Sequence, residues 1–485
     1  MVDLKVAPKV AVVGGGISGL AATHHLAKAG AKVTVVEQSP RLGGKVITEH
    51  SDGFLIEGGP DSFVSGKGSV LELAGELGLT SRIISSRPEY KGSYVWWRGR
   101  LHPLPEGLLL MAPSRLSPLL RSSLLSSKGK LRVLADLVLP RRSHVGDESL
   151  ESFVVRRLGR EVLERIAEPL IAGIHAAEPD TMSLLASFPR FLDMERDHRS
   201  LILAARSAAS KPASGNGLSY FASFKDGMGE LPAALVEGLN GVDIRTGVAV
   251  TRLTADEDNG GYRLVLDDGI ELETQAVVLA TPARDTAALL SEVIPEAAAA
   301  VASIRQVATA NVTLAYRVDE IPRLFGSGFV VPSAERRRIM GVSYLSQKWE
   351  GRVPDEQFAL VRAFVGGQHG QELALGEEDR LVAVVREELA ALIGLTADPV
   401  LVRTQSWEGG LHQYTLGHID CVATAESALA AHPGLALAGA AFHGIGLNEC
   451  VESGRRAAEM VLAAGPALGA SRASIRLQSR PGRSN

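Results

Sequence analysis

Residues 10–19 read VAVVGGGISG, and this stretch decides the fold of the chain. The apolar, mostly β-branched run Val10–Val13 predicts a buried strand that leads directly into a glycine turn. In this GxGxxG pattern, Gly14 permits a tight turn, Gly16 lets the backbone approach a pyrophosphate, and Gly19 lets the next helix pack on the strand. The phosphates are expected at the positive end of that helix. The residues expected to bind the pyrophosphate-containing cofactor in this turn are Gly14, Gly15, Gly16, Ile17, Ser18 and Gly19.

The residues that follow complete the unit. Residues 20–29 have helical composition and stop at Gly30, and residues 32–36 form a second apolar run that ends at Glu37. Glu37 lies 23 positions after Gly14, which suits the acid whose carboxylate accepts hydrogen bonds from a ribose diol. An acid here disfavours a 2′-phosphate, and therefore NADP. Strand, turn, helix, strand and acid in one unit predict an α/β fold with a Rossmann-like dinucleotide-binding domain.

A second glycine turn follows at once, in the sequence QSPRLGGK at positions 38–45. A nicotinamide dinucleotide does not need this turn, whereas a larger cofactor in the same crevice does, because the backbone must approach it again. Arg41 supplies positive charge for the phosphates. We therefore expect FAD, bound in this segment by Gln38, Arg41, Gly44 and Lys45.

Composition narrows the class of protein. The 485 residues exceed what one hydrophobic core usually organises, so two or three lobes are expected. Lys plus Arg number 51 against 55 Asp plus Glu, a net charge of −4, which argues against a partner with nucleic-acid phosphates. Cys421 and Cys450 form no CxxC pair, which indicates a reducing, cytoplasmic compartment. His412 and His418 have no carboxylate or thiol at ligand spacing, so no metal site is expected.

Two features bear on membranes. The amino terminus enters a strand directly and does not have the pattern of a secretory signal, and no stretch approaches the roughly 20 apolar residues of a spanning helix. Residues 101–140 are rich in Leu, Pro, Arg and Lys. This segment could lie on the cytoplasmic face of a membrane as a peripheral contact. The favoured interpretation is a leucine-rich helical lobe that packs on itself.

Three segments together resemble the amine oxidase-like flavoproteins: GGGISGL, VVEQSPRLGGK and, at residues 53–63, GFLIEGGPDSF. The resemblance implies an FAD site that includes the third segment and the main chain of Val248 at the adenine. Residues 435–439 then form a strand, and residues 444–450 open a final helix beside the flavin. The further cofactor residues that it implies are Gly59, Pro60, Asp61, Ser62, Val248, Trp407, Gly439, Ile445, Gly446, Leu447 and Asn448.

Within these flavoproteins, the chain from about residue 5 to residue 466 most resembles the porphyrinogen oxidases of haem biosynthesis. The middle segments carry this match, among them RIAEPLIAG at 165–173, GFVVPS at 328–333 and YTLGH at 414–418. The resemblance implies removal of six electrons from a porphyrinogen in three flavin turnovers, each reoxidised by dioxygen to give peroxide. No Ser/His/Asp set or nucleophilic cysteine is visible. We therefore expect the flavin, and no catalytic side chain, to carry the chemistry.

The resemblance covers both coproporphyrinogen III and protoporphyrinogen oxidases. Ser93 stands where plant and animal protoporphyrinogen enzymes place an arginine, and GIHAAE at 173–178 stands where many members have GIYAGD. Lys67 matches a lysine of the coproporphyrinogen-type enzymes. A substrate with four carboxylates needs more cationic partners than one with two, so coproporphyrinogen III is the favoured substrate. The substrate-binding residues expected are Lys67, Arg98, Leu170, Gly173, Gly328 and Val330.

Other interpretations stay open at this point. They are a protoporphyrinogen IX oxidase, another amine oxidase or carotenoid desaturase on the same scaffold, and a flavin-binding interaction protein without turnover. The oligomeric state is also open, with a homodimer as one alternative.

The expected domains are discontinuous. Residues 5–85, 220–285 and 425–466 would form the FAD-binding domain, and residues 86–107 and 290–420 an inserted substrate-binding sheet domain. Residues 108–205 would form the helical lobe. The polar and basic tail, 467–485, is expected to be disordered.

Overall fold

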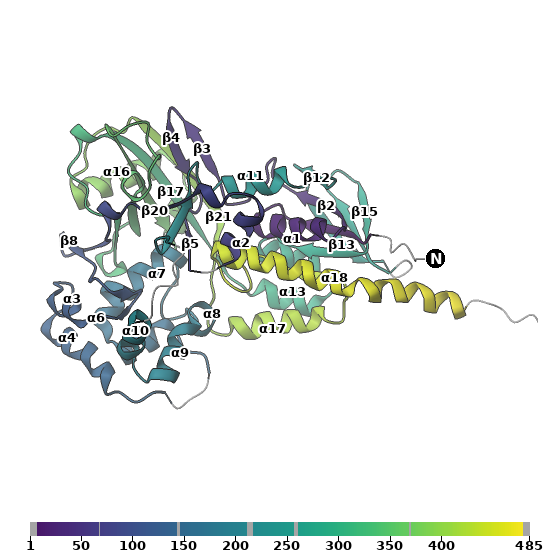
Figure 1. Cartoon of the computed structure of the whole chain (residues 1–485), viewed down its shortest axis with the longest axis horizontal. Coiled ribbons are helices and arrows are strands. Elements are labelled where there is room, and N and C mark those ends of the chain that lie inside the picture. Colours follow the sequence, from purple (N-terminus) through teal and green to yellow (C-terminus); the bar gives the residue numbers. More distant parts are fainter. Residues whose placement is uncertain are drawn as a thin grey trace, which may run out of the picture.

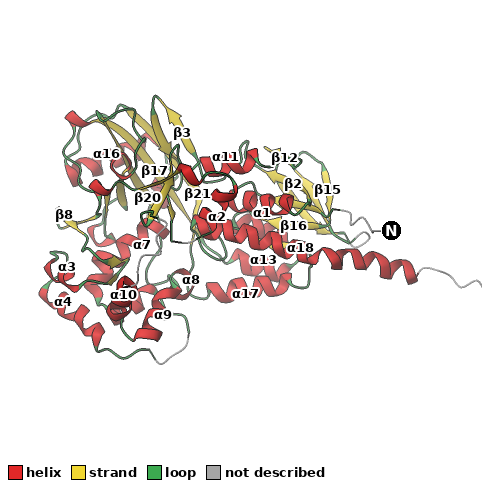
Figure 2. Ribbon diagram, viewed as in Figure 1, coloured by secondary structure: helices red, strands yellow, loops and turns green. Residues whose placement is uncertain are grey.

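The computed structural model describes residues 7–66, 68–142, 146–210, 217–256, 260–367 and 370–478. In Figure 1 the dinucleotide-binding elements lie at one end of an elongated molecule. A second sheet and a helical lobe lie at the other end. Figure 2 shows the contrast between the strands of that sheet and the helices of the lobe below it.

A five-stranded parallel sheet forms the centre of the dinucleotide-binding part. Its strands come from three distant segments of the chain, and the apolar runs of the four strands other than the edge strand formed by residues 243–246 are buried because both faces of the sheet are covered. In spatial order they are β12 (Asp243–Thr246), β2 (Lys32–Glu37), β1 (Lys9–Val13), β16 (Ala276–Leu279) and β22 (Leu435–Leu437). This arrangement confirms the predicted α/β fold.

Two long helices cover one face of this sheet, α1 (Ile17–Lys28) and α18 (Leu447–Gln478). Their backbones lie very close, because a Cβ atom added at Gly454 would come within 2.2 Å of the Ser18 carbonyl oxygen. The opposite face packs on a three-stranded sheet and three helices. These are β13 (Val250–Ala255), β14 (Tyr262–Leu266), β15 (Glu271–Thr274), α12 (Ala283–Leu290), α13 (Pro295–Ala302) and α17 (His418–Leu429).

Smaller elements complete this part. A hairpin and a second three-stranded sheet lie between it and the rest of the molecule, with two further helices beside α1 and α18. They are β3 (Thr48–Ser51), β4 (Phe54–Glu57), β5 (Phe63–Val64), β11 (Phe221–Phe224), β6 (Ile83–Ser85), α2 (Ser69–Glu76) and α11 (Glu230–Glu237).

The second large sheet has seven strands within the described residues. The helix α16 (Glu378–Ile393) packs on one of its faces. In spatial order the strands are β21 (Leu401–His412), β17 (Gln306–Arg317), β20 (Phe358–Gly366), β19 (Gly341–Tyr344), β18 (Gly328–Val330), β7 (Tyr94–Trp97) and β8 (Arg100–Pro103). The short helices α14 (Leu345–Lys348) and α15 (Gln371–Ala374) lie at its strand ends.

The helical lobe packs its leucines inward around a core of its own. Its centre holds a fully buried ion pair between Arg157 and Asp136, to which Ser200 adds a hydrogen bond. The elements are β9 (Leu108–Leu109), β10 (Ala112–Pro113), α3 (Leu116–Arg121), α4 (Ser127–Leu134), α5 (Leu150–Arg157), α6 (Arg160–Val162), a π-helical turn (Leu163–Ala167), α7 (Glu168–His175), α8 (Leu184–Ser187), α9 (Pro189–His198) and α10 (Leu201–Ser210).

Two findings concern the chain end and membranes. The predicted disordered tail begins at residue 467, but α18 continues as a helix to Gln478, and residues 479–485 lie outside the described residues. Alanine, leucine, arginine and glutamine in this segment favour extension of an established helix, which a polar composition alone does not reveal. In the described ranges, no helix has the length and apolar character needed to cross a membrane.

Candidate cofactor and substrate site

The first glycine turn connects β1 to α1 and has the geometry that its sequence predicts. Gly14 has φ +103°, and its N–H donates to the Val36 carbonyl at 2.8 Å. A Cβ atom at Gly19 would come within 1.9 Å of the Gly14 carbonyl oxygen, so only glycine lets α1 start here. A Cβ atom at Gly16 would meet nothing closer than 4.0 Å. A side chain at Gly16 would thus not clash with the protein, although the Gly44 Cα atom would lie in contact with it.

Glu37 lies at the end of β2 and is nearly buried. One carboxylate oxygen accepts the Gly15 N–H at 2.6 Å, and the other accepts the N–H and hydroxyl of Ser39 at 2.8 and 2.7 Å. The Val248 N–H donates to the Glu37 carbonyl at 3.2 Å. A main-chain contact between Val248 and an adenine would therefore use the Val248 carbonyl oxygen.

The second glycine turn packs directly on the first. The Gly43 N–H donates to the Gly15 carbonyl at 2.8 Å, and a Cβ atom at Gly44 would lie 2.9 Å from the Gly16 Cα atom. Gly44 is thus required by contact between the two turns, a reason that the sequence did not reveal. The Arg41 guanidinium donates to the Gly44 carbonyl at 2.6 Å, while Gln38 is exposed beside it.

Lys45 connects this turn to the seven-stranded sheet. Its ammonium donates to the carbonyls of Gly409 and Gly410 in β21, at 2.5 and 2.7 Å, and burial lowers the pKa of Lys45 to about 8. Trp407 of the same strand donates its indole N–H to the Gly58 carbonyl at 3.1 Å. Lys45 and Trp407 therefore fix the sheet to both loops of the predicted FAD site.

The GGPDS segment is held between the same two parts. A Cβ atom at Gly59 would lie 1.8 Å from the Lys45 carbonyl oxygen. The Asp61 carboxylate accepts hydrogen bonds from the Lys348 ammonium at 2.7 Å and the Trp349 indole at 3.0 Å. Burial alone would raise the pKa of Asp61, but the charges of Lys348 and Arg362 and these two donors hold it well below its usual range. The Asp61 side chain is thus directed to the sheet, and Pro60 and Ser62 flank it.

Arg362 is a residue of this junction that the sequence interpretation missed. It is buried on β20 and donates to the carbonyls of Glu57 and Gly59, each at 3.0 Å. The available signal was a single arginine inside the apolar strand sequence FALVRAFVG at 358–366. A buried guanidinium of this kind needs several acceptors, which the loop carbonyls provide.

The carboxyl-terminal segment closes the same site. Gly439 follows β22 with φ +122°, and a Cβ atom there would meet nothing within 4 Å. Asn448, in the first turn of α18, accepts the Val70 N–H at 3.1 Å and donates to the Val64 carbonyl at 2.9 Å. These bonds fix α18 to β5 and α2. The neighbouring predicted residues Ile445, Gly446 and Leu447 lie at or just before the start of α18.

These residues fit FAD. The two glycine turns and Glu37 lie together, as a site for phosphates and a ribose requires, and a Cβ atom at Gly439 would meet nothing within 4 Å. The N-terminus of a helix directs backbone N–H groups towards an anionic ligand, and both α1 and α18 begin beside these turns. Figure 1 shows α1, α2 and α18 gathered in one region although they come from opposite ends of the chain.

The residues predicted for the substrate divide into two groups. Leu170 of α7 and Val330 of β18 both pack half-buried on the core of the helical lobe, so they lie together between lobe and sheet. Gly328 begins β18, where a Cβ atom would lie 2.1 Å from the Val342 carbonyl oxygen, and Gly173 lies within α7. Their role in substrate binding remains a prediction.

Arg98 lies three residues beyond Val95 of β7, the residue that pairs with Val330 of β18. It is exposed in the turn between β7 and β8, its N–H donates to Glu335 at 2.8 Å, and its guanidinium lies 5.6 Å from the Trp97 ring centre. Strands β7 and β8 form the sheet edge opposite β21, so Arg98 is not brought to Trp407. Lys67 lies outside the described residues.

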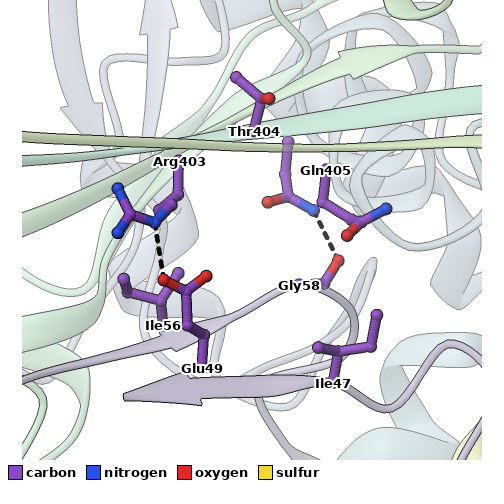
Figure 3. A pocket seen from close by; sticks show the side chains of 8 residues that line it. Ile47, Glu49, Ile56, Gly58, Arg403, Thr404 and Gln405 are labelled. Carbon is purple, nitrogen blue, oxygen red and sulfur yellow. Dashed lines mark hydrogen bonds and ion pairs between the residues drawn. The ribbon is translucent and has the colours of Figure 1, made fainter. Parts of the chain in front are cut away.

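A polar pocket behind the GGPDS segment is a different feature (Figure 3). It lies between the β3–β4 hairpin and β21, where Arg403 pairs with Glu49 at 2.7 Å and Asn311 donates to Gly58 at 2.9 Å. Arg403 also donates to Ser51 and to the Val402 carbonyl. Because these polar groups already bond to one another, they hold the β3–β4 hairpin against β21, and we assign no ligand to this pocket.

Comparison with known proteins agrees with this geometry. The profile of the flavin containing amine oxidoreductases matches residues 17–462. The chain therefore belongs to this family, as an oxidoreductase whose cofactor is FAD. Solved structures at low identity share the fold alone, among them UDP-galactopyranose mutase, with a TM-score of 0.69 at 15% identity over 96% of this chain and 99% of that one.

Within the family, the chain groups with the porphyrinogen oxidases. It is 32% identical to the coproporphyrinogen III oxidase of Bacillus subtilis, over 92% of this chain and 96% of the relative. It is 35% identical to that of Propionibacterium freudenreichii subsp. freudenreichii (93% and 90%) and 33% identical to the protoporphyrinogen oxidase of Bos taurus (94% and 99%). A solved structure from Exiguobacterium sp. 255-15, assigned provisionally as a protoporphyrinogen oxidase, is 31% identical with a TM-score of 0.82, covering 94% and 98%.

Proposed function

We propose that the protein oxidises coproporphyrinogen III to coproporphyrin III in haem biosynthesis, with FAD as cofactor and dioxygen as electron acceptor. The observation that carries this proposal is the similarity to coproporphyrinogen III oxidases, which covers more than nine-tenths of this chain. The middle segments, including RIAEPLIAG at 165–173, support it because they lie outside the dinucleotide-binding part.

The proposed substrate contacts combine an apolar wall with charged partners. Leu170, Gly173, Gly328 and Val330 would face the macrocycle, which is a large apolar disc. Lys67 would pair with a propionate, and Arg98 is a second candidate at the outer turn of the sheet. Ser93 donates to or accepts from Ser327 at 3.3 Å. It provides no charge where an arginine would select protoporphyrinogen.

FAD, when bound, supplies the acceptor for the electrons of the substrate C–H bonds. The chain's own residues would hold the cofactor. Glu37 and the glycine turns would bind its ribose and phosphates, and Lys45 and Trp407 fix the sheet over the site. Oxidation of the substrate by the flavin mainly requires that the substrate be oriented against the cofactor, so the proposal assigns no general acid or base among the described residues.

A direct test is to supply the flavin-loaded protein with coproporphyrinogen III and to follow porphyrin fluorescence and oxygen uptake together. We expect coproporphyrin III to form with about three dioxygen molecules consumed per porphyrin, as six electrons in two-electron steps require. Porphyrin formation without oxygen uptake would exclude dioxygen as the acceptor. No porphyrin from any porphyrinogen would exclude the proposed activity.

Protoporphyrinogen IX oxidation is the second candidate function. The bovine protoporphyrinogen oxidase is as similar in identity, 33%, as the coproporphyrinogen enzymes, and it covers 94% of this chain. The absence of a cation at Ser93 argues against it. Preference for protoporphyrinogen IX in the fluorescence assay would favour this function instead.

We also propose that the helical lobe contacts an anionic membrane surface. Leu131 of α4 and Val138 beyond it are 69% and 75% exposed. The cations Arg121, Lys128 and Arg141 are also exposed, each within ten residues of Leu131 or Val138 in the sequence. Apolar side chains beside cations suit a surface of anionic lipids. Co-sedimentation with phosphatidylglycerol vesicles should decrease in Leu131→Asp, and equal sedimentation of both proteins would contradict the contact.

A further inference from the structure

Tyr414 lies in the segment that follows β21, and its hydroxyl holds both ends of the loop before α18. The hydroxyl donates to the Ala440 carbonyl at 2.8 Å and accepts the Gly444 N–H at 2.7 Å. Tyr414 is only 3% exposed, and burial raises the pKa of its hydroxyl above the usual range. One protonated oxygen therefore closes the loop 440–444, whose two ends would otherwise leave a half-buried donor and acceptor without this partner.

The ring of Tyr414 is fixed as firmly as its hydroxyl. It stacks on the imidazole of His418, with ring centres 3.8 Å apart and planes at 14°. His418 is buried as well, and its Nε2 atom lies 3.1 Å from the Phe442 carbonyl oxygen. The middle of the same loop thus has its own anchor in the YTLGH segment.

The main chain around Tyr414 bonds in the opposite direction, to the helical lobe. The Ser183 N–H donates to the Tyr414 carbonyl at 2.8 Å, and the Leu416 N–H donates to the Thr181 carbonyl at 2.9 Å. The Gln413 side-chain amide donates to the carbonyl of His175, the last residue of α7, at 2.9 Å. Residues 413–418 therefore bond both to the end of α7 and to the loop before α18.

We infer that Tyr414 is a positioning residue that sets the loop before α18 for FAD, and that its neighbour Gln413 links it to the end of α7, the helix expected to bind the substrate. Gly444 has φ +130°, a backbone conformation that residues other than glycine rarely adopt. Its backbone direction is fixed by the bond to Tyr414. The loop precedes Ile445, Gly446 and Leu447, which are expected to contact the flavin. A shift of Tyr414 would therefore move the cofactor end of the site together with α7.

The test is Tyr414→Phe, with Tyr262→Phe as a matched control. Tyr262 is also buried, in β14, and its hydroxyl also bonds to backbone carbonyls, those of His432 and Pro433, each at 3.2 Å. Both variants lose one buried hydroxyl, but only Tyr414 reaches the loop before α18. We expect the Kd for FAD, measured by titrating apoprotein and following flavin fluorescence, to rise about tenfold in Tyr414→Phe and less than twofold in Tyr262→Phe.

A second variant covers the case in which Tyr414→Phe does not fold. His418→Phe keeps the stacked ring but loses the bond to Phe442, and we expect a smaller rise in the FAD Kd together with a shifted flavin absorption band. An FAD Kd unchanged in both variants would overturn the inference, as would an equal rise in Tyr262→Phe. The FAD Kd and the flavin absorption band are measured without porphyrinogen, so this test does not depend on the proposed substrate.

Discussion

The carboxylate of Glu37 accepts the main-chain N–H of Gly15 at 2.6 Å, which fixes the end of β2 to the glycine turn after β1. The residue expected to bind a ribose therefore also shapes the turn expected to bind phosphates. Removing Glu37 would affect both functions, because the Gly15 N–H would lose a charged acceptor in a nearly buried position.

We expect Glu37→Ala to raise the Kd for FAD roughly tenfold to a hundredfold, since a charge-assisted hydrogen bond is worth about 1.5–3 kcal/mol. The fold should survive, with a lower Tm of the apoprotein. The measurement is a fluorescence titration of the apoprotein with FAD. Glu76→Ala is the control, because Glu76 is a partly exposed acid that pairs with Lys28 on the surface. An unchanged Kd in Glu37→Ala would show that Glu37 does not bind the ribose.

Gly19→Ala should abolish FAD binding or folding, because the new Cβ atom would lie 1.9 Å from a backbone oxygen of Gly14. That contact cannot relax by moving a side chain. Gly75→Ala in α2 is the control: its Cβ atom would meet nothing closer than 3.9 Å, and alanine favours a helix by about 1 kcal/mol. Thermal unfolding with and without FAD distinguishes the two. Normal FAD binding in Gly19→Ala would contradict the geometry of the first turn.

Glu168, the first residue of α7, gives a pH dependence. Burial raises the pKa of Glu168 to about 7, with repulsion from Glu178 adding to the shift and the Ser333 N–H, at 3.2 Å, opposing it. Because this exceeds the ordinary value of 4.5, the folded protein binds more protons between these values, and its stability falls as pH rises through this window.

Glu168→Gln should remove this loss of folding stability at high pH, because glutamine does not ionise. We expect the variant to be more stable than the parent by up to about 3 kcal/mol at pH 8, with the difference disappearing towards pH 4.5. Chemical denaturation at both pH values measures it, and Glu356→Gln, at an exposed position, should show no such dependence. A variant less stable than the parent at pH 8 would mean that ionised Glu168 is stabilised in the fold.

The sequence allowed prediction of features whose causes are local. The strand, turn, helix, strand and acid of residues 10–37 lie within one short unit, so their pattern was sufficient to predict the Rossmann-like dinucleotide-binding domain. The direction of the Asp61 side chain could not be predicted, because its partners Lys348 and Trp349 are more than 280 positions away. The need for glycine at position 44 likewise could not be predicted, because it depends on contact between the two glycine turns. For the tail, the polar and basic composition led to a prediction of disorder, whereas α18 continues to Gln478.

Lys67→Ala tests the proposed substrate contact. A charged hydrogen bond to a propionate is worth about 1.5–3 kcal/mol, so kcat/KM for coproporphyrinogen III should fall roughly tenfold to a hundredfold while the flavin spectrum stays unchanged. Lys28→Ala is the control, since that lysine is 62% exposed and pairs with Glu76 on the surface. Full activity of the Lys67→Ala variant would show that Lys67 does not bind the substrate.

The most direct test of the central claim compares kcat/KM for coproporphyrinogen III and protoporphyrinogen IX, offered separately to the flavin-loaded protein and followed by porphyrin fluorescence. Ser93 provides no cation for the two-carboxylate substrate, and Lys67 is expected to pair with a carboxylate of the four-carboxylate one. We predict a preference of at least about tenfold for coproporphyrinogen III, the factor that one charged hydrogen bond provides. Equal efficiency on both substrates, or a preference for protoporphyrinogen IX, would contradict the assignment.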